Sequence, residues 1–302
     1  MNNILFILAL LLFIGCAEGP NPNRSKGNPL DQRTYDLVFE VSGDSSDSRL
    51  WVYSFERDSS WRLTKSSSRE ARPTRWNDTL LTYLIAENKQ WHRKGIDMRT
   101  GEETDVLPGA FDGITVQRSP NRQMIAGTQL IKDTTHIFLA RSDGKRVQWL
   151  TKGHGGGQSP KWSPDGLTLL YESEKDGNKE LYIFQLTTAY ERRVTQNNSV
   201  DQHAVWHPKG ESIAFLSSRR GPQMDVFMKN LATGKTKQLT SDSLVKERCL
   251  FSPNGKLLFY TAKENDGAFQ LFGYNMAKDS TFLVKMPSGG ISNPEWILSE
   301  DL

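Results

Sequence analysis

Short apolar runs separated by polar turns follow one another along almost the whole chain. After the turn at Asp165-Gly166 comes an apolar run at 167–171, then a polar turn at 175–178, then a second run at 181–184. The runs are rich in β-branched and aromatic residues, which favour β-strands, and the turns contain glycine. Beyond the first fifteen residues, no segment has a convincing helical period. The pattern therefore predicts an all-β protein.

Two sequence markers recur six times with one period. The first is an aromatic residue followed by a turn, as in Trp162-Ser163-Pro164-Asp165-Gly166, and the second is Leu-Thr or a relative of it. The first marker falls at residues Trp76, Arg118, Trp162, Trp206, Phe251 and Trp296. The second begins at residues Leu63, Leu107, Leu150, Val194, Leu239 and Leu283. The spacing is about 44 residues, the length of one four-stranded blade of a β-propeller, so we expect six antiparallel blades.

The order of the markers predicts how the ring closes. The first Leu-Thr marker precedes the first aromatic marker, and the last aromatic marker follows the last Leu-Thr marker. The chain is therefore expected to begin partway through a blade, with strands at 36–41 and 49–54. The segment 291–296 would return as the missing inner strand of that blade. Such closure stitches the two chain ends side by side, so that no blade is left with an open seam.

The first residues predict an export signal. Residues 4–15 are apolar or glycine, too few to span a bilayer but typical of a secretory signal. The run ends at Gly15-Cys16, which resembles the lipidation site of bacterial lipoproteins; an ordinary cleaved signal with an incidental cysteine is the alternative. We expect a lipoprotein signal peptide at 1–15, a flexible tether at 16–33 rich in Pro, Gly and Asn, and a propeller domain at 34–302.

Composition narrows the function classes. Hydrophobic residues make up 36% of the 302 and charged residues 24%, which suits a soluble globular protein. The net charge is only +3, with no basic stripe, so we expect no nucleic-acid partner. Two cysteines provide neither a disulfide framework nor a cysteine-based zinc site. We expect no metal and no cofactor.

Polar residues just before each aromatic marker are expected to face the central channel or its mouth. A solvated channel wall is sufficient to explain them, and a small binding site is the functional alternative. The candidate binding residues are Arg72, Gln158, Asp201, Gln202, His203, Lys246, Glu247, Arg248 and Asn293. The strongest of these are His203, Glu247 and Arg248. A strand would hold His203 and His207 roughly 13 Å apart, too far for one zinc ion.

Other features have structural interpretations. The aromatic markers are expected in the core between blades, and Cys249 is expected to be a buried, inert thiol. The glycine-rich segment 152–157 lacks the ending and the following helix of a phosphate loop, so we interpret it as an irregular connection between blades.

The repeat at 158–284, with its Trp-Ser-Pro-Asp-Gly turn and Leu-Thr ending, resembles the propeller repeat of the TolB family. Residues 35–157 match in register but less clearly, and because the blades begin by about residue 35 we expect no counterpart of the N-terminal α/β domain of that family. The resemblance implies a periplasmic or surface scaffold that binds another protein or a ligand at one mouth of the channel. With the lipidation site at Cys16, we expect a monomeric, non-catalytic protein, lipid-anchored to the outer membrane and facing the periplasm or the exterior. Its partner would be an envelope protein or a cell-wall or glycan ligand, and the membrane would be met only through the lipid anchor.

An enzyme is the alternative. Some propellers of this kind act as polysaccharide lyases or glycan-active hydrolases through channel His, Glu and Arg side chains. In this chain, His203 and Glu247 would have to converge with Asp201 or Arg248.

Overall fold

A computed structural model describes residues 35–42, 47–88, 90–106, 115–145, 147–284, 286 and 290–298. The expected signal peptide, the tether and Cys16 lie outside these residues. The described residues form β-strands, turns and loops without a helix, so no helix among them is long and apolar enough to cross a membrane. The predicted all-β class is confirmed.

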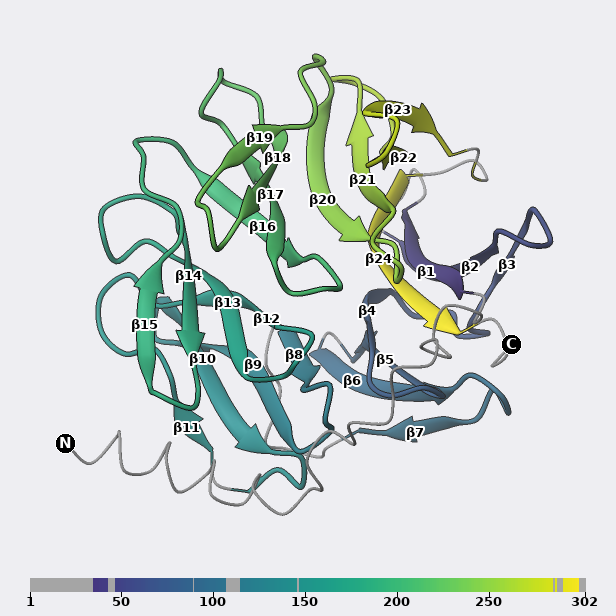
Figure 1. Ribbon diagram of the computed structural model, residues 1–302. Helices are drawn as coiled ribbons and strands as arrows, with labels where there is room; N and C mark the ends of the chain where they lie inside the picture. Colours follow the sequence, from purple (N-terminus) through teal and green to yellow (C-terminus); the bar gives the residue numbers. More distant parts are fainter. Residues whose placement is uncertain are drawn as a thin grey trace, which may run out of the picture.

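Six four-stranded antiparallel sheets form the fold, and they stand around a common centre like the blades of a propeller (Figure 1). We number the blades 1 to 6 and give the strands of each from the centre outward. Blade 1 contains β24 (Gly290–Leu298), β1 (Tyr35–Ser42), β2 (Ser48–Ser54) and β3 (Ser59–Arg62). Blade 2 contains β4 (Glu70–Arg75), β5 (Leu80–Glu87), β6 (Gln90–Asp97) and β7 (Glu103–Asp105). Blade 3 contains β8 (Thr115–Arg118), β9 (Met124–Ile131), β10 (Thr134–Arg141) and β11 (Gln148–Trp149).

The second half of the chain repeats this arrangement. Blade 4 contains β12 (Gln158–Trp162), β13 (Thr168–Ser173), β14 (Glu180–Gln185) and β15 (Tyr190–Arg193). Blade 5 contains β16 (Asp201–Trp206), β17 (Ser212–Ser217), β18 (Asp225–Asn230) and β19 (Thr236–Gln238). Blade 6 contains β20 (Val245–Phe251), β21 (Leu257–Lys263), β22 (Gln270–Asn275) and β23 (Ser280–Leu283). The predicted number of blades is therefore confirmed.

The ring closes in blade 1, where the last strand pairs with the first. Strand β24 lies antiparallel to β1, with Leu37 opposite Trp296 and Val41 opposite Ile291 (Figure 1). Ile291 and Trp296 are buried against Phe259 of blade 6, so this strand also joins blade 1 to its neighbour. The predicted closure by a C-terminal inner strand is confirmed.

The hydrophobic core consists of layers between neighbouring blades. One layer combines Met124 and Leu139 of blade 3 with Trp162, Leu169 and Tyr171 of blade 4, all less than 9% exposed. A single sheet could not bury both of its faces, whereas each blade here is covered by the next one around the ring.

Three tryptophans also connect neighbouring blades by hydrogen bonds. In each case the indole N–H donates to a backbone carbonyl 45 residues earlier, in the inner strand of the preceding blade. The donor and acceptor pairs are Trp162 with Gln117 at 3.2 Å, Trp206 with Lys161 at 3.1 Å, and Trp296 with Phe251 at 2.7 Å. The aromatic marker therefore joins adjacent inner strands as well as filling the core.

In blade 2 the marker is shifted by one residue. Arg75 pairs with Leu81 as Trp162 pairs with Leu169, so Arg75 occupies the marker position and Trp76 is the first residue of the turn. Trp76 is still buried, with the Arg118 guanidinium carbon 5.7 Å from the centre of its ring.

A bulge recurs in the inner strands and shapes the mouth of the channel. The pairing register shifts in β4, β12, β16, β20 and β24. In four of these strands a non-glycine residue adopts a left-handed backbone conformation, with φ between 46° and 55°. These residues are Arg72, Ser159, His203 and Asn293. The bulge turns their backbone and side chains away from the regular ladder.

Candidate functional site

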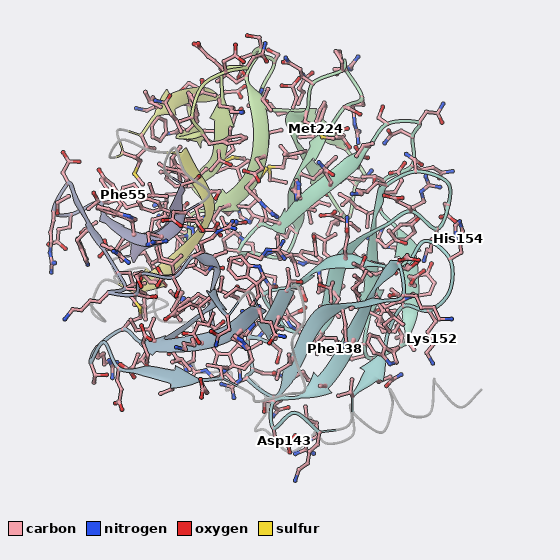
Figure 2. The ribbon with its side chains drawn as sticks, turned by 180° about the vertical axis from the view of Figure 1, so that it is seen from behind. Phe55, Phe138, Asp143, Lys152, His154 and Met224 are labelled. Carbon is pink, nitrogen blue, oxygen red and sulfur yellow. The ribbon has the colours of Figure 1, made fainter. Side chains whose placement is uncertain are left out.

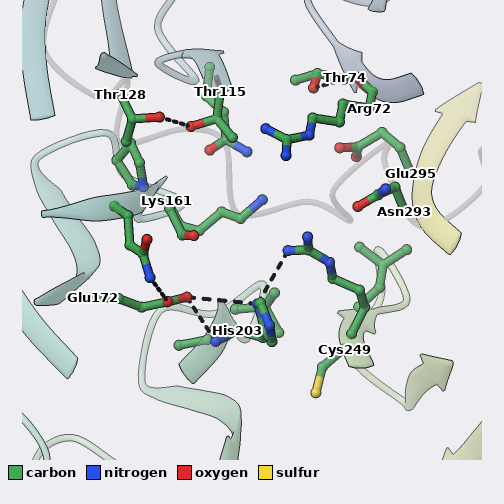
Figure 3. A pocket seen from close by; sticks show the side chains of 18 of the residues that line it. Arg72, Thr74, Thr115, Thr128, Lys161, Glu172, His203, Cys249, Asn293 and Glu295 are labelled. Carbon is green, nitrogen blue, oxygen red and sulfur yellow. Dashed lines mark hydrogen bonds and ion pairs between the residues drawn. The ribbon is translucent and has the colours of Figure 1, made fainter. Parts of the chain in front are cut away.

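Side chains from all six inner strands converge on one cavity of about 280 Å³ at the centre of the ring (Figure 3). Five of the nine predicted site residues line this cavity: Arg72, Gln158, His203, Arg248 and Asn293. They come from β4, β12, β16, β20 and β24, so segments more than two hundred residues apart in sequence share one site.

The other four predicted residues lie elsewhere. Asp201 is fully buried and accepts hydrogen bonds from Arg219 Nη2 at 2.9 Å and Asn197 Nδ2 at 2.7 Å. Lys246 is also enclosed, and its ammonium group contacts Asp242 at 2.7 Å and Asp225 of blade 5 at 3.2 Å. Asp201 and Lys246 each lie two residues before a channel residue, and the register shift of the bulge takes them off the face that simple alternation would give them.

Gln202 and Glu247 do not line the cavity either. The Gln202 amide nitrogen lies 3.9 Å from the sulfur of Met224. Glu247 sits at the bulge of β20, between Lys246 and Arg248, where the pairing register shifts. The bulge brings Arg248, rather than Glu247, to the channel.

Glu172 is the centre of a buried hydrogen-bond network on one side of the cavity. Its carboxylate accepts the backbone N–H of His203 at 2.8 Å and the Gln158 side-chain amide at 3.0 Å (Figure 3). Glu172 is only 2% exposed, and burial raises the pKa of this carboxyl, although the hydrogen bonds oppose the shift. The carboxylate joins blade 4 to blade 5 at the left-handed residue of β16.

Glu40 forms the equivalent network in blade 1. It accepts the backbone N–H of Arg72, the left-handed residue of blade 2, and the Asn293 side-chain amide at 2.6 Å. Burial raises the pKa of Glu40 as well.

The position of these glutamates reveals a twofold repeat within the sixfold ring. Along the second strands of blades 1 to 6 the equivalent residues are Glu40, Leu84, Thr128, Glu172, Leu216 and Thr261. The order Glu, Leu, Thr thus occurs twice, so the ring consists of two similar three-blade halves. Arg72 in one half corresponds to His203 in the other.

His203 is neutral in this setting. Its Nδ1 lies 3.2 Å from Arg248 Nη1 and 3.8 Å from a Glu172 carboxylate oxygen (Figure 3). Because Arg248 is a donor, Nδ1 accepts this hydrogen bond and the ring proton is on Nε2. Burial and the nearby cations Arg248, Lys179 and Lys161 lower the pKa of His203 to about 3. These effects exceed the opposing attraction of Glu172.

Lys161 and Glu295 line the same cavity, although neither is among the residues predicted from the sequence. Each directly precedes an aromatic marker that was assigned to the core, and the residue next to the marker was not considered for the channel. Alternation along the strand could have identified them, because the residue before a core tryptophan must face the channel. Burial lowers the pKa of Lys161 and raises that of Glu295, while the attraction between the two opposes both shifts.

Gln117 of blade 3 positions the Lys161 side chain. In the amide orientation that satisfies both of its groups, the Gln117 oxygen accepts from Lys161 Nζ at 2.8 Å. Across the wall, the Thr115 and Thr128 hydroxyls lie 2.9 Å apart. The cavity therefore contains three cationic side chains, three carboxylates at or behind its wall, and a neutral imidazole.

The glycine-rich connection at 152–157 borders a second cavity beside the first. That cavity has a volume of about 350 Å³ and shares Gln158 and Glu172 with the channel. Gly156 has φ 48°, and a Cβ there would lie 2.1 Å from the Thr135 carbonyl oxygen, so glycine is required for this close approach. Lys152 and His154 lie near the outer edge of the ring (Figure 2).

His207 and Cys249 have structural roles. The ring of His207 packs edge-on against Phe251 of blade 6, with centroids 4.9 Å apart, and its Nδ1 accepts the N–H of Lys209. Cys249 is buried, and burial raises its pKa to about 12. Among the described residues, no group of three or more His, Cys, Asp and Glu side chains is placed to hold a metal ion.

The fold and this central cavity define a six-bladed β-propeller with a polar, charged channel mouth. The family model of the TolB beta propeller domain matches residues 75–299, so the chain belongs to this family.

Individual relatives agree with this assignment. The chain is 31% identical over 127 residues to the Tol-Pal system protein TolB of Alcanivorax borkumensis, an alignment that covers 42% of this chain and 28% of that protein. It is 26% identical over 157 residues to the TolB homolog of Chlorobium luteolum, covering 52% of this chain and 35% of the homolog. The chain thus spans about a third or less of these curated relatives.

Solved structures show the same fold. The crystal structure of TolB from Acinetobacter baumannii superposes with a TM-score of 0.75 at 19% identity, covering 86% of this chain and 66% of that one. An oligogalacturonate lyase in complex with manganese superposes with a TM-score of 0.59 at 14% identity, covering 85% of this chain and 79% of the lyase.

Proposed function

We propose that this chain is a non-catalytic binding protein of the bacterial cell envelope, which holds a protein or glycan ligand at one mouth of its channel. The observation that carries the proposal is the convergence of all six inner strands on one charged cavity. A solvated wall needs no buried charge, whereas this wall contains the half-buried Lys161 and the buried Glu172, whose removal from water is costly. A relative named as a Tol-Pal system protein supports an envelope partner.

Attachment to the membrane by lipid at Cys16 is part of this proposal. It is supported by the apolar run at 4–15 and by the Gly15-Cys16 junction. Metabolic labelling with radioactive palmitate should mark the wild-type chain and not Cys16→Ser. Label retained by Cys16→Ser would contradict lipidation at this residue.

Photo-crosslinking in living cells tests where the ligand binds. A photoreactive amino acid is placed at Thr135, which lines both cavities, and in a matched variant at Tyr190, which is 59% exposed on the outer strand β15. We expect an adduct from position 135 and none from position 190. Adducts from position 190 alone would move the binding surface to the outside of the ring and refute the proposal.

A glycan-active enzyme is the second candidate, favoured by the neutral imidazole of His203 beside Arg248 and Glu172. The enzyme alternative required His203 and Glu247 to converge with Asp201 or Arg248. His203 contacts Arg248, whereas Asp201 is bound to Arg219 and Glu247 does not line the cavity. An enzyme would therefore use His203 with Arg248 and Glu172 instead. Turnover of a polyuronate that disappears in His203→Ala would establish this function, and equal turnover in both chains would exclude a role for His203.

A further inference from the structure

Two cations point into the channel mouth from blades on different sides of it. Lys161 comes from β12 and Arg248 from β20, and both line the central cavity (Figure 3). Burial lowers the pKa of Lys161 and of Arg72. Arg248 adds to both shifts, while Glu295 opposes the shift of Lys161 and Glu40 opposes that of Arg72. The fold thus holds like charges close together in a poorly solvated space, an arrangement that a bound anion would relieve.

The carboxylates of the wall are engaged by the fold itself. Glu172 accepts from His203 and Gln158, Glu40 accepts from Arg72 and Asn293, and Glu295 accepts the N–H of Trp296 at 3.2 Å. These bonds hold the carboxylates within or between their blades. They leave the cations as the groups able to rearrange around a ligand.

The Arg248 guanidinium has N–H donors that make no hydrogen bond within the described part of the chain. Within the described part of the chain it makes one hydrogen bond, from Nη1 to His203 Nδ1, and its buried Nε has no partner. A guanidinium carries five N–H donors in a planar fork that matches a carboxylate in a bidentate manner. A buried donor without a partner is costly, so a ligand that accepts from it gains affinity.

We propose that the channel mouth binds a carboxylate of a polypeptide, held by Arg248 and Lys161 with Arg72 facing them. This inference rests on the proposed binding function and names the chemistry of its ligand. The carboxylate could be an Asp or Glu side chain or a chain terminus, since both present the same two oxygens.

The lining favours a peptide over a sugar acid. Pro73, Val205 and Leu250 supply aliphatic walls that suit the methylene groups of an acidic side chain. Among the described residues that line the cavity there is no Trp, Tyr or Phe, so a sugar ring would find no aromatic face to stack on. A cavity of about 280 Å³ has room for one or two residues of an inserted peptide.

Binding of short peptides to the full chain tests the inference, followed by NMR of the histidine side chains. The probes are acetyl-Gly-Glu-Gly-amide, acetyl-Gly-Gly-Gly with a free terminus, the neutral acetyl-Gly-Gln-Gly-amide, galacturonate and inorganic phosphate. We expect the His203 signals to shift with one or both peptide carboxylates and not with the neutral peptide. Loss of one cation should weaken binding about tenfold or more, because one charge-assisted hydrogen bond accounts for that factor.

Matched variants locate the effect. Arg248→Gln and Lys161→Met should each lose affinity, whereas Lys237→Gln, which removes a charge 58% exposed on the outer strand β19, should bind like wild type. Equal binding of the neutral peptide, or equal or tighter binding of galacturonate or phosphate, would overturn the inference.

The same variants separate this inference from the proposed function. If Arg248→Gln keeps the crosslinked adduct from position 135 and its affinity, the carboxylate inference fails and binding at the mouth stands. If position 135 gives no adduct in wild type, the proposed function itself fails.

Discussion

Removing the positive charge of Arg248 should raise the pKa of His203. In the wild-type fold this pKa is about 3, compared with an ordinary value of 6.5, because the imidazole is buried and lies beside Arg248, Lys179 and Lys161. Even at the dielectric constant of water, a unit charge about 4 Å away contributes about 1 kcal/mol, close to one pKa unit. We therefore expect Arg248→Gln to shift the titration upward by about one unit or more. It should stay below 6.5, because burial is the larger cause and Gln leaves it in place.

The depressed pKa also makes His203 a determinant of acid stability. The unfolded chain binds a proton at His203 below pH 6.5 and the folded chain does not until about pH 3, so acidification favours unfolding in this window. A shift of this size corresponds to on the order of 5 kcal/mol at the acid end. Glu172 has the opposite sign: its raised pKa makes the folded state bind the proton more tightly, so its contribution to stability falls as the pH rises above 4.5.

Histidine side-chain NMR isolates His203 from these opposing contributions. Selectively labelled protein is titrated from pH 8 downward to the acid limit of the fold, for wild type, Arg248→Gln and the control Lys237→Gln. Wild type and control should keep a neutral His203 throughout the range from pH 8 to 5. Titration of wild-type His203 near 6.5 would refute the explanation by burial and cations, and an unchanged Arg248→Gln would remove Arg248 from it.

Three further outcomes are expected. The first concerns Trp296→Phe, a substitution for which Phe251 at the equivalent position of blade 6 is a natural precedent. It should lower the free energy of unfolding by about 1–3 kcal/mol, because the buried Phe251 carbonyl loses the indole N–H that it accepts. An unchanged urea midpoint by circular dichroism would contradict this role of the indole N–H. Deleting residues 290–302 should abolish the cooperative transition, because the inner strand of blade 1 is lost; a native-like melt would argue against closure by this strand. Cys249, with its pKa raised to about 12, should stay unmodified by a thiol reagent at pH 8 until urea unfolds the chain, as measured by peptide mass spectrometry, and rapid labelling of the native protein would show that the thiol is accessible.

The ring of blades could be predicted from the sequence because the same two sequence markers recur in every blade. Six copies of each marker give the period, and their order at the two ends gives the closure between β1 and β24. Burial between blades imposes the same apolar pattern on every blade. A blade with a degenerate marker can therefore be aligned with the blades whose markers are clear. The register of blade 2 was the exception, because Trp76 stands next to Arg75, which occupies the marker position.

The channel site was only partly predictable, for a physical reason. A bulge reverses which face a side chain occupies, and nothing in the residue types of β20 shows that Arg248 rather than Glu247 turns to the centre. Strand alternation counted back from each aromatic marker would have included Lys161 and Glu295. It would also have retained Asp201 and Lys246, which only the register shift of the bulge takes out of the channel. The hydrogen bonds of Glu40 and Glu172 to the next blade depend on three-dimensional contacts and have no local signal.

Hydrogen exchange of the protein, alone and bound to the partner captured by crosslinking, tests most directly whether the channel mouth is the binding surface. Our account predicts added protection at the bulges of β4, β12, β16 and β20, with the outer strands β7, β15 and β19 unchanged. Protection confined to the outer strands, with the exchange of the four bulges unaltered, would contradict it.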